Sequence, residues 1–298
     1  MLTGKTKVIT LSHVCSLFPK RKQDSHKGDF GRLLCITGSV RMPGAAAMSS
    51  YAALRSGAGL LTTATAAQNI PALSSHCFES MYLPLLTDKD GFITWDGNEE
   101  ILTDAVKKAD AVLVGCGLGL TEQTAILTKN IIRLAGCPLI LDADGLNAVS
   151  SGIDIIAERE NPVILTPHPG EMARLLKIST NEVQNNRVYT IYKAMECMPG
   201  AVIVLKGSGT LVGQDGTILL NTTGNPGMSR GGSGDVLAGM TAAFAAQGLK
   251  PFEAAAAGVY IHGMAGDIAA ERFSQQAMLP SDLISCIPEA FLKIEENR

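Results

Sequence analysis

Short apolar runs alternate with helix-forming segments along most of this chain, and this alternation limits the fold more than any other feature. The runs are bounded by Gly, Pro or polar residues, which is typical of strands buried on both faces of a sheet. Helices between successive strands provide the crossovers that parallel strands need. The sequence therefore predicts an α/β fold with a mostly parallel central sheet flanked by helices on both faces. The expected strands cover residues 32–37, 60–66, 77–85, 111–115, 138–141, 162–165 and 201–205.

After the last of these strands, residues 211–212 and 217–220 predict a hairpin around Gly213 to Gly216. Residues 1–25 precede the first strand and are expected to form an N-terminal adapter. Because no linker interrupts the pattern, we expect one domain over residues 1–298. The expected helices cover residues 45–56, 99–108, 122–135, 182–197, 235–247, 252–273 and 281–296, together with a short helix ending at Lys177.

Composition excludes several classes of function. The chain has 298 residues, 46% of them hydrophobic and 18% charged, with a net charge of −3 and a pI near 6.0. This balance gives no electrostatic footprint for nucleic acid, and no apolar segment reaches the roughly 18 residues of a membrane span. No signal peptide opens the sequence. Seven scattered cysteines without a C-x-x-C pair favour reduced thiols in a cytoplasmic protein.

A glycine-rich loop before the helix expected at 235–247 predicts an anion site. Residues 222–228 are too rich in Gly and Pro for helix or strand, and the glycine cluster at 231–234 leads directly into that helix. Such a loop directs free backbone N–H groups and the positive end of the helix dipole at one point, which suits phosphate. Asp235 would lie at the same point. Its carboxylate either caps the helix or takes a proton from a hydroxyl that attacks phosphate, and the local sequence leaves both interpretations open.

Other polar clusters follow the expected strands. In open α/β sheets ligands bind beyond the carboxyl ends of the strands, so we expect these clusters to meet at one rim. Lys206 to Thr210 offers a cation, amides and hydroxyls to a nucleotide, or is a plain entry to the hairpin. The other clusters are Gly115 to Gly119, the trio Asp142, Asp144 and Asn147, and the pair His168 and Glu171.

The residues of the last two clusters have alternative roles. Asp142, Asp144 and Asn147 are acidic enough to hold a hydrated cation, or else they cap the following helix. His168 lies between two prolines that fix its backbone, which favours a positioned ligand contact. Glu171 lies near a helix start, where it caps the helix or reaches Mg²⁺ through water.

Several familiar signatures are excluded. The chain has no G-x-x-x-x-G-K-[ST] motif, and Gly115 to Leu120 fails the dinucleotide-binding pattern G-x-G-x-x-G. Gly227 to Gly231 matches the G-x-S-x-G pattern of hydrolases, but Gly and Pro on both sides do not suit the strand-to-helix turn that this motif needs. No His/Cys cluster has zinc spacing.

The order of several blocks resembles one family. Residues 225–239 resemble the signature of the NAD(P)H-hydrate dehydratases, members of the ribokinase-like superfamily. The resemblance covers roughly residues 25–290. Only about 25 residues precede it, so an N-terminal epimerase domain, present in some relatives, is expected to be absent. The other matching blocks are residues 27–32, 38–39, 42–46, 54–59, 142–147, 165–171 and 204–207.

The resemblance implies a reaction that repairs a damaged cofactor. The substrate would be the S-epimer of 6-hydroxylated, hydrated NADH or NADPH, and the co-substrate ADP or ATP. Asp235 would activate the C6 hydroxyl for attack on the terminal phosphate, and the amides of Gly232, Ser233 and Gly234 would form an anion hole. Loss of phosphate would then restore NAD(P)H, with AMP released from ADP or ADP from ATP.

The resemblance also implies the remaining site residues. The nucleotide site would consist of Lys206, Gly207, Ser208, Gly209, Thr210 and Gly234, and the hydrate site of Ala45, Gly117, His168 and Asp235. Glu171 would contact Mg²⁺ through water, although His168 stands where related kinases carry Asn in an N-x-x-E motif. Relatives suggest a homo-oligomer, with a homotetramer favoured.

The sequence leaves two alternatives to the dehydratase function open. A kinase of the same fold would phosphorylate a hydroxymethylpyrimidine or hydroxyethylthiazole vitamin precursor with the same Asp235 and anion hole. The blocks at 42–44 and 167–171 favour the dehydratase. A non-catalytic nucleotide sensor is the other alternative, and the complete glycine loop with Asp235 argues against it. Together, the blocks favour catalysis over capping for Asp235.

Overall fold

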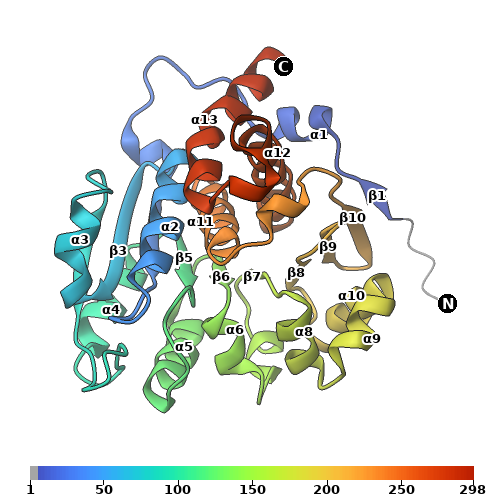
Figure 1. Ribbon diagram of the computed structural model, residues 1–298. Coiled ribbons are helices and arrows are strands. Elements are labelled where there is room, and N and C mark those ends of the chain that lie inside the picture. Colours follow the sequence, from blue (N-terminus) through green and yellow to red (C-terminus); the bar gives the residue numbers. More distant parts are fainter. Residues whose placement is uncertain (1–5) are drawn as a thin grey trace.

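A computed structural model describes residues 6–298 and contains one sheet of ten strands (Figure 1). The order across the sheet is β1-β10-β9-β8-β7-β6-β5-β2-β3-β4. The strands are β1 (Lys7–Val8), β2 (Arg32–Ile36), β3 (Leu60–Ala66), β4 (Met81–Leu85), β5 (Ala111–Val114), β6 (Leu139–Leu141), β7 (Val163–Leu165), β8 (Val202–Leu205), β9 (Leu211–Gln214) and β10 (Thr217–Leu220).

Parallel pairing dominates this sheet. All neighbours from β8 across to β4 pair in parallel, and β1 pairs in parallel with β10. Only β9, among the described strands, runs against its two neighbours. The carboxyl ends of β2, β5, β6, β7 and β8 therefore open at the same edge, as the sequence predicted.

Helices cover both faces of the sheet. Figure 1 shows α2, α11, α12 and α13 on one side of the row of strands and α5, α6, α8 and α10 on the other. The helices are α1 (Leu11–Leu17), α2 (Pro43–Arg55), α3 (Ile70–Ser74), α4 (Glu99–Lys107), α5 (Glu122–Leu134), α6 (Asp144–Val149), α7 (Asp154–Ala157), α8 (Pro169–Leu176), α9 (Thr180–Asn185), α10 (Arg187–Cys197), α11 (Ser233–Ala246), α12 (Pro251–Ala277) and α13 (Pro280–Glu296).

The strand residues divide between two hydrophobic cores. In β2, Leu33 and Cys35 pack with α2, α11, α12 and α13, whereas Leu34 and Ile36 pack with the helices on the other face. Successive side chains of a strand point to opposite faces, so a strand covered on both sides must be apolar at every position. This requirement explains the uninterrupted apolar runs of the sequence.

The predicted fold class is confirmed, and most predicted elements lie within a few residues of the observed ones. One prediction is wrong in detail, because the single helix expected at 182–197 is two helices, α9 and α10, separated at Asn186 (φ −135°, ψ 50°). Helix α6 was not among the helices predicted by residue range. In the expected adapter, β1 extends the sheet and α1 packs in the core that contains α12 and α13, while residues 1–5 lie outside the described residues.

Close packing of α2 against α11 positions the glycine loop. A Cβ on Gly239 of α11 would lie 2.0 Å from the backbone oxygen of Ser49 in α2. Only glycine allows this approach of the two helices. Because Asp235 lies one turn before Gly239, the same contact fixes the start of α11 relative to α2.

Gly239→Ala is expected to lower the free energy of unfolding by about 1–3 kcal/mol, because the added methyl group must push two packed helices apart. Thermal unfolding measures the effect as a lower Tm. Gly136→Ala is the matched control, since nothing lies within 4 Å of a Cβ at that position. Equal Tm values for the two variants would contradict this account of the α2–α11 contact.

Candidate active site

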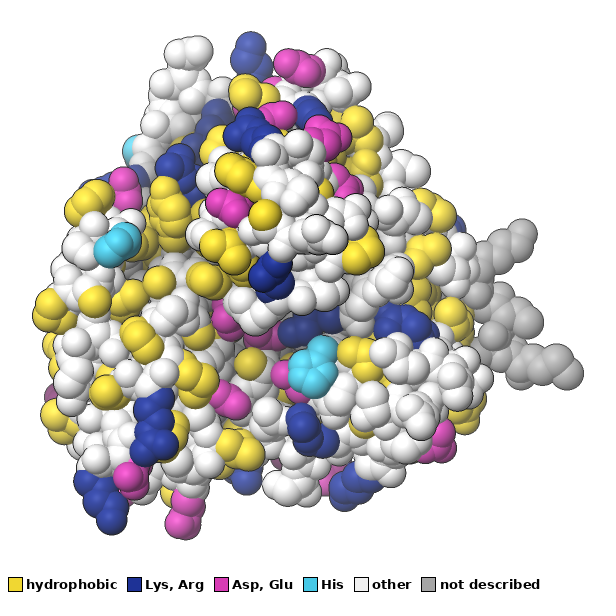
Figure 2. Space-filling view, viewed as in Figure 1, with side chains coloured by type: hydrophobic (Ala, Val, Ile, Leu, Met, Phe, Trp, Pro, Cys, Tyr) yellow, Lys and Arg dark blue, Asp and Glu magenta, His cyan; other side chains and the backbone are white. Residues whose placement is uncertain are grey.

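The polar clusters that follow the strands meet near one point of the molecular surface. Figure 2 shows acidic, basic and histidine side chains gathered near the middle of the face seen in Figure 1. Lys206, which follows β8, lies 2.7 Å from Asp142, which follows β6. Glu171, near the end of β7, lies 3.9 Å from the same ammonium group. The predicted rim is therefore a real juxtaposition of side chains.

Asp142 and Lys206 form the central ion pair of this site. Asp142 is 1% exposed, and its Oδ1 accepts hydrogen bonds from the Lys206 ammonium and from Thr166 Oγ1, each at 2.7 Å. Burial alone would lower the pKa of Lys206, but the carboxylates of Asp142 and Glu171 raise it. Lys206 is therefore charged at neutral pH. Its ammonium also lies 3.2 Å from the position of a Cβ on Gly234.

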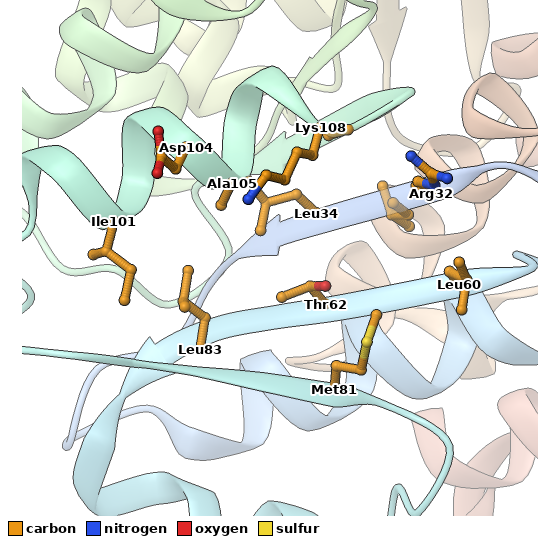
Figure 3. A pocket seen from close by; sticks show the side chains of 12 residues that line it. Arg32, Leu34, Leu60, Thr62, Met81, Leu83, Ile101, Asp104, Ala105 and Lys108 are labelled. Atoms are coloured by element: carbon orange, nitrogen blue, oxygen red, sulfur yellow. The ribbon is translucent and has the colours of Figure 1, made fainter.

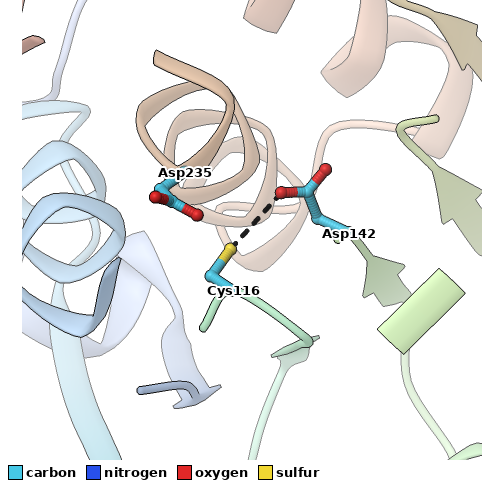
Figure 4. Close-up of side chains that lie close together, drawn as sticks. All are labelled: Cys116, Asp142 and Asp235. Atoms are coloured by element: carbon cyan, nitrogen blue, oxygen red, sulfur yellow. Dashed lines mark hydrogen bonds between the residues drawn. The ribbon is translucent and has the colours of Figure 1, made fainter. Parts of the chain in front are cut away.

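Asp235 does not cap its helix. Helix α11 begins at Ser233, its N-cap is Gly232, and no hydrogen bond among the described residues joins the Asp235 carboxylate to the first amides of the helix. Instead the carboxylate faces Cys116 and Asp142, whose ligand atoms all lie within 4.8 Å of one another (Figure 4). Burial, and then the charge of Asp142, raise the pKa of Asp235 to about 7. Such a carboxyl can accept a proton near neutral pH.

Cys116 is a neighbour of Asp235 that the sequence pattern did not single out. Its thiol is fully buried and lies 3.6 Å from Asp142 Oδ2, to which it donates a weak hydrogen bond. Burial, followed by the charges of Asp235 and Asp142, raises the pKa of this thiol well above its usual value. Cys116 is therefore a protonated thiol between two carboxylates.

The start of α11 carries backbone amides without partners. Gly232 has φ 102°, a conformation that favours glycine, and it turns the chain into the helix. The N–H groups of Gly232, Gly234 and Asp235 have no acceptor in residues 6–298, whereas Ser233 donates its N–H to the carbonyl of Arg230 at 3.2 Å. Of the predicted anion hole, Gly232 and Gly234 thus present free amides, Asp235 adds a third, and the Ser233 amide is already used.

His168 and Glu171 are joined at the start of α8. His168 Nδ1 accepts from the amides of Gly170 and Glu171, and Glu171 Oε2 accepts from the His168 amide at 2.7 Å. His168 Nε2 lies 3.3 Å from Glu171 Oε1. Burial and the nearby Lys206 lower the pKa of His168, so the ring is neutral, with its hydrogen on Nε2. Both residues cap the helix, and half of the His168 side chain remains exposed.

Glu171 shares the electrostatic environment of Asp235. It is 4% exposed, and burial raises its pKa to about 7, although the charge of Lys206 opposes this shift. Glu171, Asp142 and Asp235 therefore surround a single ammonium group, Lys206. These oxygen donors are of the kind that Mg²⁺ prefers, and the surplus of acidic groups would be relieved by a bound cation.

Ala45 and Gly117 are brought together on the α2 side of the site. A Cβ on Gly117 would lie 2.6 Å from the Cβ of Ala45, so the two residues are in contact. Gly117 has φ 67°, which only glycine adopts readily. The buried loop at 115–119, which contains Cys116, therefore packs directly against the start of α2.

The predicted acidic trio is divided among separate partners. Asp142 pairs with Lys206, Asp144 Oδ2 accepts from the amide of Gly119 at 2.7 Å, and Asn147 Oδ1 accepts from Arg174 at 3.0 Å. Each of the three side chains thus contacts a different neighbouring segment. In the loop at 206–210, Ser208 is exposed at the tip and Thr210 Oγ1 donates to the carbonyl of Gly207.

A cavity of about 550 Å³ lies elsewhere, between α4 and strands β2, β3 and β4 (Figure 3). Arg32, Leu60 and Met81, which line it, stand at the beginnings of their strands. The cavity is therefore at the opposite end of the sheet from the clusters described above. It contains none of the predicted site residues.

Comparison with known proteins agrees with this geometry. A family model described as NAD(P)H-hydrate dehydratase matches residues 33–289. The chain belongs to this family. It is similar to the bifunctional NAD(P)H-hydrate repair enzyme of Moorella thermoacetica, with 38% identity over 98% of this chain and 55% of that protein. It is also similar to the ADP-dependent (S)-NAD(P)H-hydrate dehydratase of Bacillus subtilis, with 33% identity over 96% of this chain and 98% of that protein.

Solved structures confirm the ribokinase-like fold of this family member. The Bacillus subtilis ADP/ATP-dependent NAD(P)H-hydrate dehydratase, co-crystallised with ATP and Mg²⁺, superposes with a TM-score of 0.82 and 30% identity, covering 97% of this chain and 99% of that one. A ribokinase-like superfamily protein from Enterococcus faecalis gives a TM-score of 0.85 and 31% identity, covering 97% and 96%.

The chain matches only part of the length of the bifunctional relatives. The chain spans about half the length of the bifunctional repair enzymes it matches, 53% to 55% for three of them. Among the described residues, no helix is both long and apolar enough to cross a membrane. The family assignment favours the dehydratase over the vitamin-precursor kinase.

Lys206→Met is expected to destabilise the protein by about 3 kcal/mol, because it leaves the buried Asp142 carboxylate without its cation. Chemical denaturation measures the loss. Adding Asp142→Asn to this variant removes the unpaired charge and should recover part of the stability. Lys107→Met, at an exposed position of α4, controls for loss of a lysine. A double variant less stable than Lys206→Met alone would contradict the ion-pair account.

Proposed function

We propose that this chain catalyses the nucleotide-dependent dehydration of the S-epimer of hydrated NADH or NADPH, with ADP or ATP as co-substrate. The observation that carries the proposal is Asp235, a carboxylate that does not cap its helix and lies beside unpartnered amides at the start of α11. A base next to an anion site suits the transfer of phosphate to a hydroxyl group. Membership of the dehydratase family supplies the identity of that hydroxyl.

In the first step, Asp235 accepts the proton of the C6 hydroxyl. The hydroxyl oxygen then bonds to the terminal phosphorus of the nucleotide, while the bond from that phosphorus to the remaining nucleotide breaks. ADP would leave AMP, and ATP would leave ADP. The raised pKa of Asp235, about 7, makes it a stronger base than an ordinary aspartate while leaving it largely ionised above neutral pH.

Charge on the transferring phosphate is stabilised at the start of α11. The free amides of Gly232, Gly234 and Asp235 would donate to its oxygens, and the positive end of the helix dipole adds to this field. The Lys206 ammonium, fixed by Asp142, lies beside Gly234 and contributes a full positive charge. When bound, Mg²⁺ neutralises phosphate charge. Glu171 would hold it through water.

The two substrates would approach from opposite sides of Asp235. We assign the nucleotide to Gly234 and the loop at 206–210. We assign the hydrated nicotinamide to Ala45, Gly117 and His168, of which Ala45 and Gly117 are in contact. His168 would present its exposed ring and its Nε2 hydrogen.

In the second step, phosphate leaves C6 and a proton leaves the neighbouring carbon. These losses restore the double bond of the dihydronicotinamide ring. Phosphorylation is needed because hydroxide is a poor leaving group, whereas phosphate is a good one. The active site would therefore act as a kinase centre whose product keeps no phosphate.

The setting of the enzyme is also a proposal. We propose that residues 1–298 work as one ribokinase-like domain with an N-terminal adapter, in the cytoplasm. Substrates would be small molecules, without nucleic-acid or membrane partners. A homo-oligomer, by resemblance a homotetramer, is the proposed assembly, and size-exclusion chromatography with light scattering tests it.

The direct test is recovery of reduced-nicotinamide absorbance from hydrated NADH, with Mg²⁺ and either ADP or ATP. We expect recovery that depends on the nucleotide and releases one phosphate for each NADH formed. If neither nucleotide restored the absorbance of NADH or of NADPH, the proposed reaction would be wrong.

Asp235→Asn is expected to lower kcat by a factor on the order of 10² to 10⁴, because the amide keeps the shape of the side chain but cannot take the proton. Nucleotide affinity should change much less. Asp215→Asn, in the turn between β9 and β10, is the matched control and should retain full activity. Near-normal turnover by Asp235→Asn would remove Asp235 as the base.

The rate should rise with pH and level off above about pH 7, since the base must be ionised and the pKa of Asp235 is raised to about 7. A pH profile of kcat/KM measures this limb. Because Glu171 also has a pKa of about 7, Glu171→Gln distinguishes the two groups. If the limb disappeared in Glu171→Gln, it would belong to Glu171 and not to Asp235.

A further inference from the structure

Arg187, at the start of α10, forms hydrogen bonds with the loop that follows β8. Its guanidinium donates to three backbone carbonyls, at 3.0 Å to Leu205, 3.3 Å to Lys206 and 3.3 Å to Gly209. Among the described residues, its one side-chain acceptor is Gln184, at 3.5 Å. One planar group thus fixes the orientation of several peptide units in the segment 205–209.

These contacts determine where the loop amides point. In a trans peptide unit the C=O and the N–H point in opposite directions. The carbonyls of Lys206 and Gly209 face Arg187, so the N–H groups of Gly207 and Thr210 face away from it. The peptide unit between Leu205 and Lys206 shows the direction that faces away from Arg187. Its carbonyl faces Arg187, and its N–H donates to the carbonyl of Pro167 at the end of β7. The side away from Arg187 is therefore the side of the active site.

The amides on that side are available to a ligand. Within residues 6–298, the N–H groups of Gly207 and Thr210, which face away from Arg187, have no hydrogen-bond acceptor, and the amides of Ser208 and Gly209 have none either. With the carbonyls of Lys206 and Gly209 turned toward Arg187, the amides that follow them present partial positive charge on the other side, which suits the oxygens of a nucleotide. Without Arg187, the carbonyl dipoles would be free to turn toward the same oxygens and repel them.

The charge of Arg187 is also not neutralised locally. It forms no ion pair with a carboxylate among the described residues, and its side chain is partly buried. Desolvation lowers its pKa, yet a guanidinium group remains charged at any physiological pH. A purely structural contact between α10 and β8 would not require an uncompensated cation behind a loop of free amides.

We propose that Arg187 is a positioning residue that orients the loop 206–210 for nucleotide binding and adds positive charge behind it. The inference rests on the proposed nucleotide site. Arg187 itself does not touch the reacting atoms. It acts through the amides of Gly207 and Thr210, so its contribution is to affinity for ADP or ATP and not to the chemical step.

Arg187→Met tests the inference, because it keeps an unbranched apolar stem and removes every donor. We expect the Kd for ADP, measured by calorimetry without the hydrated substrate, to rise about tenfold or more. In the full reaction, the KM for ADP should rise by a similar factor, while kcat at saturating ADP and the KM for hydrated NADH stay within about twofold. Arg187→Lys, which can reach fewer carbonyls, should give an intermediate Kd.

Gln184→Ala is the matched control, since it removes the side-chain acceptor of Arg187 and leaves the three carbonyl contacts. Its Kd for ADP should equal that of the unaltered protein. An unchanged Kd in Arg187→Met and Arg187→Lys, or an equal rise in KM for both substrates, would overturn the inference. Unaltered protein that binds ADP but does not dehydrate the substrate would refute the proposed reaction and leave this inference standing.

Discussion

The ion pair between Asp142 and Lys206 holds the active site together. It joins the ends of β6 and β8, which are separated by β7, and Thr166 at the end of β7 donates to the same carboxylate oxygen. Residues that follow three neighbouring strands therefore meet at one atom, Oδ1 of Asp142. The ammonium then reaches Glu171 on one side and the start of α11 on the other. Because a buried carboxylate needs a partner, the position of Lys206 is set before any ligand arrives.

The buried, acidic surroundings of the Asp235 carboxylate destabilise the folded state when that group is ionised. The folded-state pKa of about 7 is above the ordinary value of 3.8, because burial and the charge of Asp142 disfavour ionisation. The contribution of this group to stability is therefore complete below the unfolded pKa and is lost as pH rises through the folded pKa. At neutral pH the protein keeps a carboxylate in a place that favours its neutral form. Active-site bases, the role proposed for Asp235, commonly have this property, since the burial that raises basicity also destabilises the folded state.

Sequence reasoning located the sheet and the rim because both depend on local patterns. Uninterrupted apolar runs identified β2, β5 and β8, and the polar residues after them identified the site. The break between α9 and α10 was not predictable in this way, because the helical pattern continues through Asn186. As a result Arg187 looked like an interior helix residue, whereas it stands at the first position of α10 and faces the loop after β8. The roles of Cys116 and Thr166 also depend on neighbours distant in the sequence.

The choice between capping and catalysis for Asp235 shows where local sequence stops being informative. An aspartate near the start of a helix satisfies the rules for a cap, but here the Asp235 carboxylate makes no hydrogen bond to the first amides among the described residues and lies beside Cys116. Those amides are then left for a ligand. In the proposed reaction, Lys206 could not leave Asp142 to follow a moving phosphate without exposing a buried charge, so the phosphate would have to come to a fixed ammonium. Fixed amides and a fixed cation need no reorganisation when charge develops on the phosphate, and this is the condition under which such groups accelerate a reaction most.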